Sequence, residues 1–183
     1  YEEVIIKTTR FLDNVIDVNF YPVPEINVAS KESRRIGLGV MGVADLLYKL
    51  RISYNSKEGY EFMAKLSEAL SYYSMEESVA LAQSRSEFPL CSKTEYPDGK
   101  IPIAGFYEKP KSVHYYDWDA LITKIKKYGI RNVLTTTVAP TGTLSMIADC
   151  SNGMEPTFAL VFEKRVTVGR FFYTNKIFEQ VLR

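Results

Sequence analysis

The feature that most constrains the fold of this chain is the order of its hydrophobic periodicities. Apolar residues recur at helical spacing in four stretches, residues 1–19, 33–50, 57–84 and 117–129. Residues 131–138 are rich in β-branched side chains, as strands are, and residues 158–167 form a second strand-like run. A last helical period occupies residues 175–183. Because helices and strands alternate in this way, the sequence predicts an α/β fold that is rich in helix.

Turn and cap residues mark the ends of these stretches. Two prolines in residues 20–25 break the first helical period, and Ser56 is an N-cap residue for the helix that begins at Lys57. Residues 86–117 contain four prolines and two glycines, which predicts a long irregular excursion. No capping residue precedes the first period and no Gly or Pro follows the last. We therefore expect a piece of a longer chain rather than a chain with frayed ends.

Composition excludes several classes of protein. The 183 residues are 46% hydrophobic and 25% charged, which is typical of a globular protein and excludes wholesale disorder. A net charge of +1 argues against nucleic-acid binding through a dominant basic field. Two cysteines and one histidine provide neither a disulfide framework nor a metal site. No apolar run approaches the roughly 20 residues that span a bilayer, and no signal peptide is present, so we expect a cytoplasmic protein without a membrane partner.

Three glycines, Gly37, Gly39 and Gly42, match the dinucleotide-binding fingerprint as a string of letters. A polar stretch rather than a buried strand precedes them, and no second strand with an acidic end follows at the required distance. We interpret the string as part of a helix, in which the glycines allow another backbone to pack closely. A further possible function, that of a dinucleotide-dependent oxidoreductase, has no support in the sequence beyond this string.

The single histidine and the two cysteines are weak candidates for catalysis. His114 lies among aromatic residues and has no partner nucleophile nearby, which favours packing or hydrogen bonding over general base chemistry. Cys150 has no activating neighbour in the sequence, so we expect an inert small side chain rather than a nucleophile.

The turn around Gly142 is the strongest candidate site. A predicted strand enters it and a predicted helix leaves it, so free amides and hydroxyls converge at the positive end of the helix dipole. Gly142 allows close approach to the backbone, and Thr141 and Thr143 offer donors. Charge-assisted hydrogen bonds of this kind contribute about 1.5–3 kcal/mol each. The turn therefore has the composition of a phosphate site, although an ordinary capped turn would have the same composition.

Several motifs in a fixed order resemble the catalytic subunit of ribonucleotide reductases. Six stretches carry the resemblance, residues 10–17, 34–47, 114–121, 128–132, 139–145 and 151–156. The Pro-Thr-Gly sequence of the turn, which begins at Pro140, is similar to that of the adenosylcobalamin-dependent class. Because the motifs span nearly the whole chain, residues 1–183 are identified as part of one barrel domain of this family.

The resemblance implies a fold and an activity. The fold would be part of a ten-stranded α/β barrel, and the activity that of a ribonucleoside-diphosphate reductase, an oxidoreductase that makes deoxyribonucleotides by a thiyl-radical mechanism. The turn matches the family's segment for the substrate diphosphate, which gives five candidate binding residues, Pro140, Thr141, Gly142, Thr143 and Leu144. Adenosylcobalamin is the implied cofactor. The implied partners are the ribonucleotide substrate, the rest of the catalytic chain, a thioredoxin-like reductant and a second copy in a homodimer.

The chain also departs from the family pattern. The Asn-x-Cys-x-Glu radical motif, the paired reductant cysteines and the allosteric nucleotide loops are absent, so Cys91 and Cys150 inherit no catalytic role. No catalytic residue and no metal ligand is therefore assigned. We expect the isolated chain to be inactive, and a non-catalytic nucleotide-binding or structural module is the alternative function.

Overall fold

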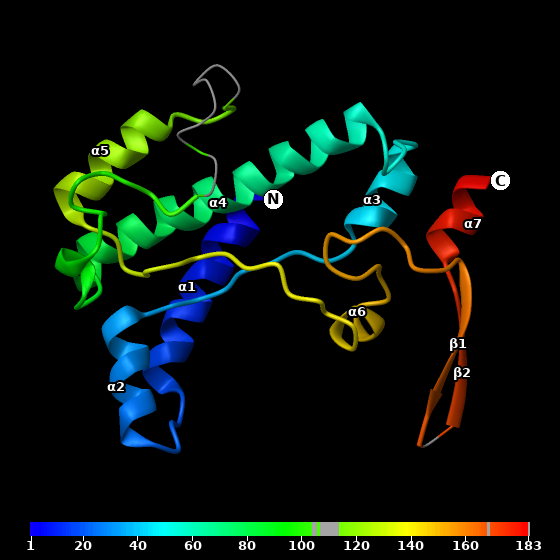
Figure 1. The fold of residues 1–183 in the computed structure, drawn as a ribbon, viewed down its shortest axis with the longest axis horizontal. Coiled ribbons are helices and arrows are strands. Elements are labelled where there is room, and N and C mark those ends of the chain that lie inside the picture. Colours follow the sequence, from blue (N-terminus) through cyan, green and yellow to red (C-terminus); the bar gives the residue numbers. More distant parts are fainter. Residues whose placement is uncertain (104–105, 107–113, 168, 183) are drawn as a thin grey trace. The chain divides into compact units, whose positions relative to one another are not determined.

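The computed structural model of this chain describes residues 1–103, 106, 114–167 and 169–182 (Figure 1). The elements in chain order are α1 (Glu2–Val18), α2 (Pro24–Ser33), α3 (Val43–Leu50), α4 (Lys57–Arg85), the 3-10 helix η1 (Cys91–Lys93), α5 (Trp118–Tyr128), α6 (Leu144–Ile147), β1 (Val161–Val166), β2 (Gly169–Thr174) and α7 (Lys176–Leu182). Contacts divide the chain into a first unit, residues 1–38 with 65–137, and a second unit, residues 39–64 with 138–183.

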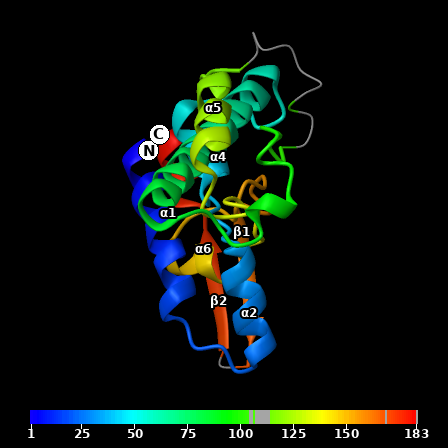
Figure 2. The same ribbon diagram turned by 90° about the vertical axis from the view of Figure 1, so that its left-hand side faces the viewer.

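In the first unit, α1 buries one face. Ile5, Thr9, Asp13 and Ile16 are the buried residues, and their spacing of three or four places them on one side of the helix. The helix begins at the second residue, as the sequence predicts, with no side-chain cap. α2 lies beside α1 (Figure 2) and buries no residue. The sequence did not predict α2, although Pro24 occupies its first turn, where proline is well tolerated.

The hydrophobic core of the first unit forms where α5 lies along the C-terminal half of α4 (Figures 1 and 2). Its buried members are Met75, Val79, Phe88, Cys91, Tyr96, Ile101, Trp118, Leu121, Ile125 and Ile130. The expected bounds of α5 are confirmed because its caps are strong: Asp117 accepts a hydrogen bond from the Ala120 amide at 2.9 Å, and Gly129 ends the helix at φ 72°. Most of the expected excursion, residues 86–117, is irregular apart from η1, while residues 104–105 and 107–113 lie outside the described residues.

Two extended segments of the first unit meet as parallel neighbours. Leu38 pairs with Thr136 in a single bridge, through the Leu38 amide to the Thr135 carbonyl at 2.8 Å and the Thr137 amide to the Leu38 carbonyl at 3.0 Å. Among the described residues, the predicted strand at 131–138 is reduced to this single bridge. The predicted helix over 33–50 is wrong in its first half: α2 ends at Ser33, its C-cap residue Arg34 has φ 45°, and the next helix, α3, begins only at Val43. Glycine is a poor helix former, so three glycines in six residues outweighed the apolar spacing.

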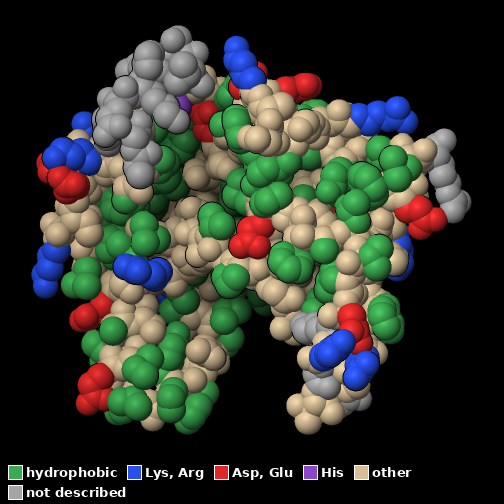
Figure 3. Space-filling model, turned by 45° about the vertical axis from the view of Figure 1, so that its right-hand side comes forward, with side chains coloured by type: hydrophobic (Ala, Val, Ile, Leu, Met, Phe, Trp, Pro, Cys, Tyr) green, Lys and Arg blue, Asp and Glu red, His purple; other side chains and the backbone are tan. Residues whose placement is uncertain are grey.

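The second unit contains an antiparallel hairpin. β1 pairs with β2 from Val161 opposite Thr174 to Val166 opposite Gly169. β1 confirms the predicted strand at 158–167 with narrower bounds, whereas β2 was not predicted. Glu163 forms ion pairs with Arg165 at 2.9 Å and Arg170 at 3.6 Å, and charged side chains gather on the hairpin in Figure 3. The expected terminal helix is α7, where Asn175 accepts a hydrogen bond from the Phe178 amide at 2.7 Å.

These strands are only part of the expected fold. Among the described residues the structure contains one two-stranded sheet and no closed barrel, so the ten-stranded barrel itself is not observed. The helix-rich architecture agrees with the prediction. None of the helices in the described part of the chain is both long and apolar enough to span a bilayer.

Candidate functional site

A tight turn at residues 139–145 leads into α6. Its Thr141 lies in the left-handed region at φ 51°, a conformation that β-branched residues rarely adopt. The Ser145 amide closes the turn by donating to the Thr141 carbonyl at 2.8 Å. Within the described part of the chain, the amides of Gly142, Thr143 and Leu144 make no hydrogen bond, and all three residues are exposed. Three backbone donors of the predicted site are thus free to bind a ligand.

The predicted helix that leaves the turn is a short one. α6 has four residues, and Thr143 at its N-cap makes no side-chain capping bond. A single turn of helix has a small dipole, so the expectation that a helix dipole favours the anion is not supported. The capacity of the turn to bind an anion rests on its free amides and on the hydroxyls of Thr141 and Thr143 instead.

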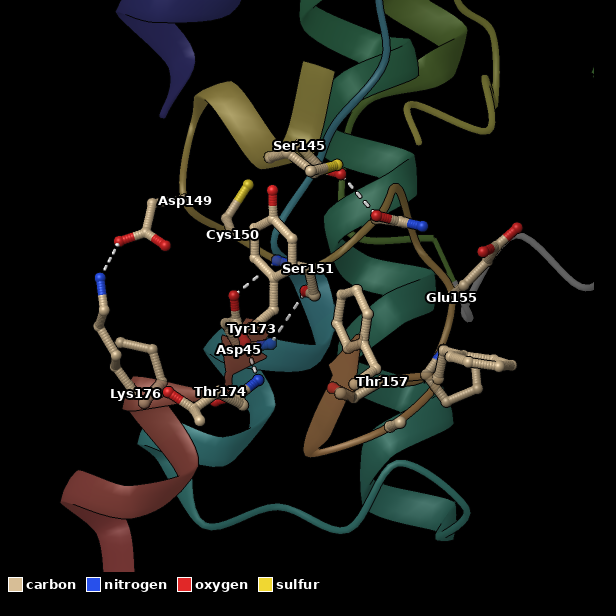
Figure 4. Close-up of a pocket in the computed structure, with 18 of the residues that line it drawn as sticks. Asp45, Ser145, Asp149, Cys150, Ser151, Glu155, Thr157, Tyr173, Thr174 and Lys176 are labelled. Carbon is tan, nitrogen blue, oxygen red and sulfur yellow. Dashed lines mark hydrogen bonds and ion pairs between the residues drawn. The ribbon is translucent and has the colours of Figure 1, made fainter. Parts of the chain in front are cut away.

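A pocket of about 520 Å³ lies in the second unit beside this turn (Figure 4). Gly142 and Ser145 line it, and a Cβ atom built on Gly142 would meet no atom within 4 Å. Aromatic side chains of the hairpin, Phe162 and Tyr173, form another part of its wall and stack with ring centroids 5.1 Å apart. The predicted glycine of the turn therefore faces open space large enough for part of a small ligand. Of the other four predicted residues, Pro140, Thr141, Thr143 and Leu144, none lines the pocket.

One cysteine and one ion pair also line the pocket. Burial raises the pKa of the Cys150 thiol, and the negative charges of Asp45 and Asp149 raise it further. This thiol stays protonated at neutral pH, which agrees with the expectation that Cys150 is inert. Lys176 binds Asp149 at 2.9 Å, and this pair is visible in Figure 4.

Comparison with known proteins gives the family of the chain. The family model described as the barrel domain of ribonucleotide reductase matches residues 1–183. The chain belongs to the ribonucleotide reductase barrel-domain family. The resemblance inferred from the ordered motifs is thereby confirmed.

Curated relatives of this barrel domain include both general and cobalamin-dependent reductases. The ribonucleoside-diphosphate reductase subunit alpha of Chlamydia pneumoniae is 36% identical over 95% of this chain and 18% of its own length. The vitamin B12-dependent ribonucleoside-diphosphate reductase of Thermoplasma acidophilum is 39% identical over 99% of this chain and 20% of its own length. The B12-dependent enzyme of Mycobacterium tuberculosis is 35% identical over the whole chain and 22% of its own length. The chain thus spans about a fifth of the length of these relatives.

Three of the family motifs converge on a polar network in the first unit. Its residues come from α1, from the end of α2, from α4 and from the segment after α5: Asp13, Asp17, Arg34, Ser78, Arg85, Arg131 and Asn132. Sequence reasoning quoted these motifs but did not bring their side chains together. The signal was an aspartate on the apolar face of α1, four residues after Thr9 and three before Ile16.

Asp13 is the centre of this network. Its carboxylate is fully buried and binds Arg34 at 2.8 Å and the Asn132 side-chain amide at 2.9 Å. Arg85 and Arg131 approach it at 3.4 Å and 3.5 Å. Burial by itself would lower the pKa of Arg34, but its hydrogen bonds to Asp17 and Asp13 outweigh burial and raise that pKa. The same hydrogen bond from Arg34 lowers the pKa of Asp17.

The weak candidates have structural surroundings. His114 stacks on Phe106 with ring centroids 4.7 Å apart, and its Nδ1 atom lies 3.6 Å from Glu68, in agreement with a packing role. Cys91 is 1% exposed, and burial raises its pKa to about 11. The glycine string lies between α2 and α3 and not in a helix, which corrects that part of its interpretation, and a Cβ on Gly37 would lie 2.9 Å from the Thr137 side chain. Gly37 is therefore closely packed, but against the Thr137 side chain and not against another backbone as expected.

Proposed function

We propose that this chain is the part of a ribonucleotide reductase catalytic chain that holds the diphosphate of the ribonucleotide substrate. The observation that carries the proposal is the turn at Thr141, where three consecutive amides are free beside a pocket. Successive free amides form a concave donor set that suits phosphate oxygens. Gly142 has no Cβ to obstruct the approach of the ligand. The family's own diphosphate segment resembles this turn, so geometry and resemblance lead independently to the same residues.

The chemistry of the complete reductase would be reduction of the ribose by a cysteine thiyl radical. Two of the relatives described above are named as vitamin B12-dependent reductases, and the Pro-Thr-Gly turn resembles that class. We therefore propose adenosylcobalamin as the radical generator. The described residues do not fit this cofactor: the one imidazole of the sequence, His114, stacks on Phe106, and its Nε2 atom is buried inside the chain. We therefore assign the cofactor to the rest of the catalytic chain.

The proposed partners follow from the same assignment. They are the ribonucleotide substrate, the rest of the catalytic chain, a thioredoxin-like reductant and a second copy of the enzyme, in the cytoplasm. The chain by itself would be a non-catalytic nucleotide-binding module. Its two thiols favour this role, because the pKa of each is raised and neither is poised as a thiolate.

The proposal is tested by Gly142→Val in the complete reductase chain. The added side chain would occupy the open space next to the free amides, and we expect the dissociation constant for cytidine diphosphate to rise at least tenfold. Loss of one charge-assisted hydrogen bond, about 1.5–3 kcal/mol, is sufficient for that change. Folding should be unaffected, since Gly142 lies outside the left-handed region and a Cβ there touches nothing.

Ala148→Val provides a matched control for this experiment. Ala148 is exposed just after α6 and does not line the pocket. Its substitution introduces the same valine side chain outside the turn. The Ala148→Val variant should have the same dissociation constant for cytidine diphosphate as the unmodified enzyme. An unchanged constant for Gly142→Val, measured by equilibrium dialysis, would refute the diphosphate assignment.

A further inference from the structure

Asp45 occupies an unusual place at the start of α3. It is the third residue of the helix and is 8% exposed, although it is charged. One carboxylate oxygen accepts the Ser151 amide at 2.7 Å, and the other accepts the Asn175 side-chain amide at 2.9 Å. The Asp45 amide in turn donates to the Ser151 hydroxyl at 3.3 Å. A buried carboxylate is costly unless it is hydrogen-bonded, so these contacts keep Asp45 in one arrangement.

The segment that Asp45 holds, residues 151–153, contacts the phosphate turn directly. Ser145 donates to the Asn152 side-chain oxygen at 2.5 Å, and the Gly153 amide donates to the Thr141 hydroxyl oxygen at 2.8 Å. These bonds fix the two ends of the turn, and the free amides lie between them. The bond to Thr141 also holds that residue in its rare left-handed conformation.

The start of α3 makes one more contact with the same segment. Gly42 adopts φ 78° at the N-cap of α3, and its amide donates to the Ser151 carbonyl at 2.9 Å. Ser151 is therefore bound through its amide, its carbonyl and its hydroxyl. Figure 4 shows Asp45 and Ser151 beside each other on the side of the pocket that carries Cys150.

We propose that Asp45 is a positioning residue for the substrate diphosphate. It acts through residues 151–153 to hold the turn from Thr141 to Ser145 in the shape that presents its amides. This inference rests on the proposed function, because it assigns to the turn the ligand proposed above. Preorganised donors bind an anion more tightly than mobile ones, since less conformational entropy is lost on binding.

The test is Asp45→Asn in the complete reductase chain, with inorganic pyrophosphate as a probe of the diphosphate subsite. Asparagine keeps the size of the side chain but loses one of the two acceptors. We expect the inhibition constant of pyrophosphate against cytidine diphosphate and the KM for cytidine diphosphate to rise together by about tenfold. The kcat should stay within twofold, because the reacting groups are untouched. General destabilisation would instead lower kcat and leave the two binding constants unchanged.

Two further variants make the result decisive. Glu58→Gln removes a carboxylate from an exposed position of α4 in the same unit and should leave all three constants unchanged. Asn152→Ala breaks the next bond along the path, to Ser145, and should raise the inhibition constant of pyrophosphate even if Asp45→Asn does not fold. If the folded Asp45→Asn variant, or Asn152→Ala in its place, binds pyrophosphate normally while Gly142→Val does not, the positioning role is wrong. If Gly142→Val also binds it normally, the diphosphate site itself is wrong.

Discussion

At the scale of single residues, Asp13 decides how the motifs of the first unit fit together. Its buried carboxylate binds side chains from three other segments, of which Arg34 and Asn132 are the nearest. Asn132 is itself fully buried and also bonds to Ser78 at 2.8 Å and to the Arg34 carbonyl at 3.0 Å. A connected network of this kind specifies one packing arrangement because each member satisfies its neighbours.

We predict that Asp13→Asn lowers the free energy of unfolding of the 183-residue chain by about 3–5 kcal/mol, because buried Arg34 then loses its buried counter-ion and keeps only the half-exposed Asp17. The measurement is urea denaturation followed by circular dichroism. Asp98→Asn changes an exposed carboxylate in the same unit and should shift the free energy by less than about 0.5 kcal/mol. Equal effects of the two variants would show that the network contributes nothing beyond surface charge.

At the scale of elements, the helices with strong caps are the ones whose bounds the sequence predicts well. α5 has Asp117 before it and Gly129 after it, and α4 has Ser56, whose hydroxyl accepts the Gly59 amide at 3.0 Å. α3 lacks such a signal, since Gly42 caps it only through its backbone conformation. The helix predicted from residue 33 therefore began ten residues too early.

For α5 we predict that Asp117→Ala lowers the free energy of unfolding by about 0.5–2 kcal/mol, since the Ala120 amide loses its acceptor. Asp117→Asn keeps a side-chain oxygen in the capping position and should retain most of the stability. Thermal denaturation of both variants distinguishes the cap from a general charge effect. A loss of the same size for Asn and Ala would mean that the negative charge, rather than the hydrogen bond, stabilises the helix.

At the scale of the whole molecule, the two units differ in how much of their structure is buried. Leu121, Ile125 and Ile130 of the first unit are at most 1% exposed. In the second unit, every residue of β2 except Tyr173 is exposed. A two-stranded hairpin is marginally stable unless a further element covers it.

We accordingly predict slow hydrogen exchange for the amides of α5 and fast exchange for those of β1 and β2 in the 183-residue chain. Local opening of an exposed hairpin needs little free energy, whereas opening α5 exposes the core of its unit. Mass spectrometry of peptic fragments measures both regions in one experiment. Protection of the hairpin equal to that of α5 would contradict the prediction.

The sequence by itself determined the helical periods, the caps of α4 and α5, the β1 strand and the turn around Gly142. Each depends on residues close together in the chain, whose spacing or backbone preference acts locally. The ordered motifs also identified the family, because several matches in sequence order are far more specific than one. The outcome of local competition at the glycines before α3 was misjudged, and neither α2 nor β2 was predicted.

Only the tertiary structure decided which polar groups serve the site and which hold the fold. Asp45 and Ser151 form two hydrogen bonds with each other in opposite directions, and they are 106 positions apart in the sequence. Asp13 and Asn132 are 119 apart, and no periodicity relates residues at such separations. A buried carboxylate must find its partners wherever folding brings a donor, so the pairing follows from packing rather than from spacing.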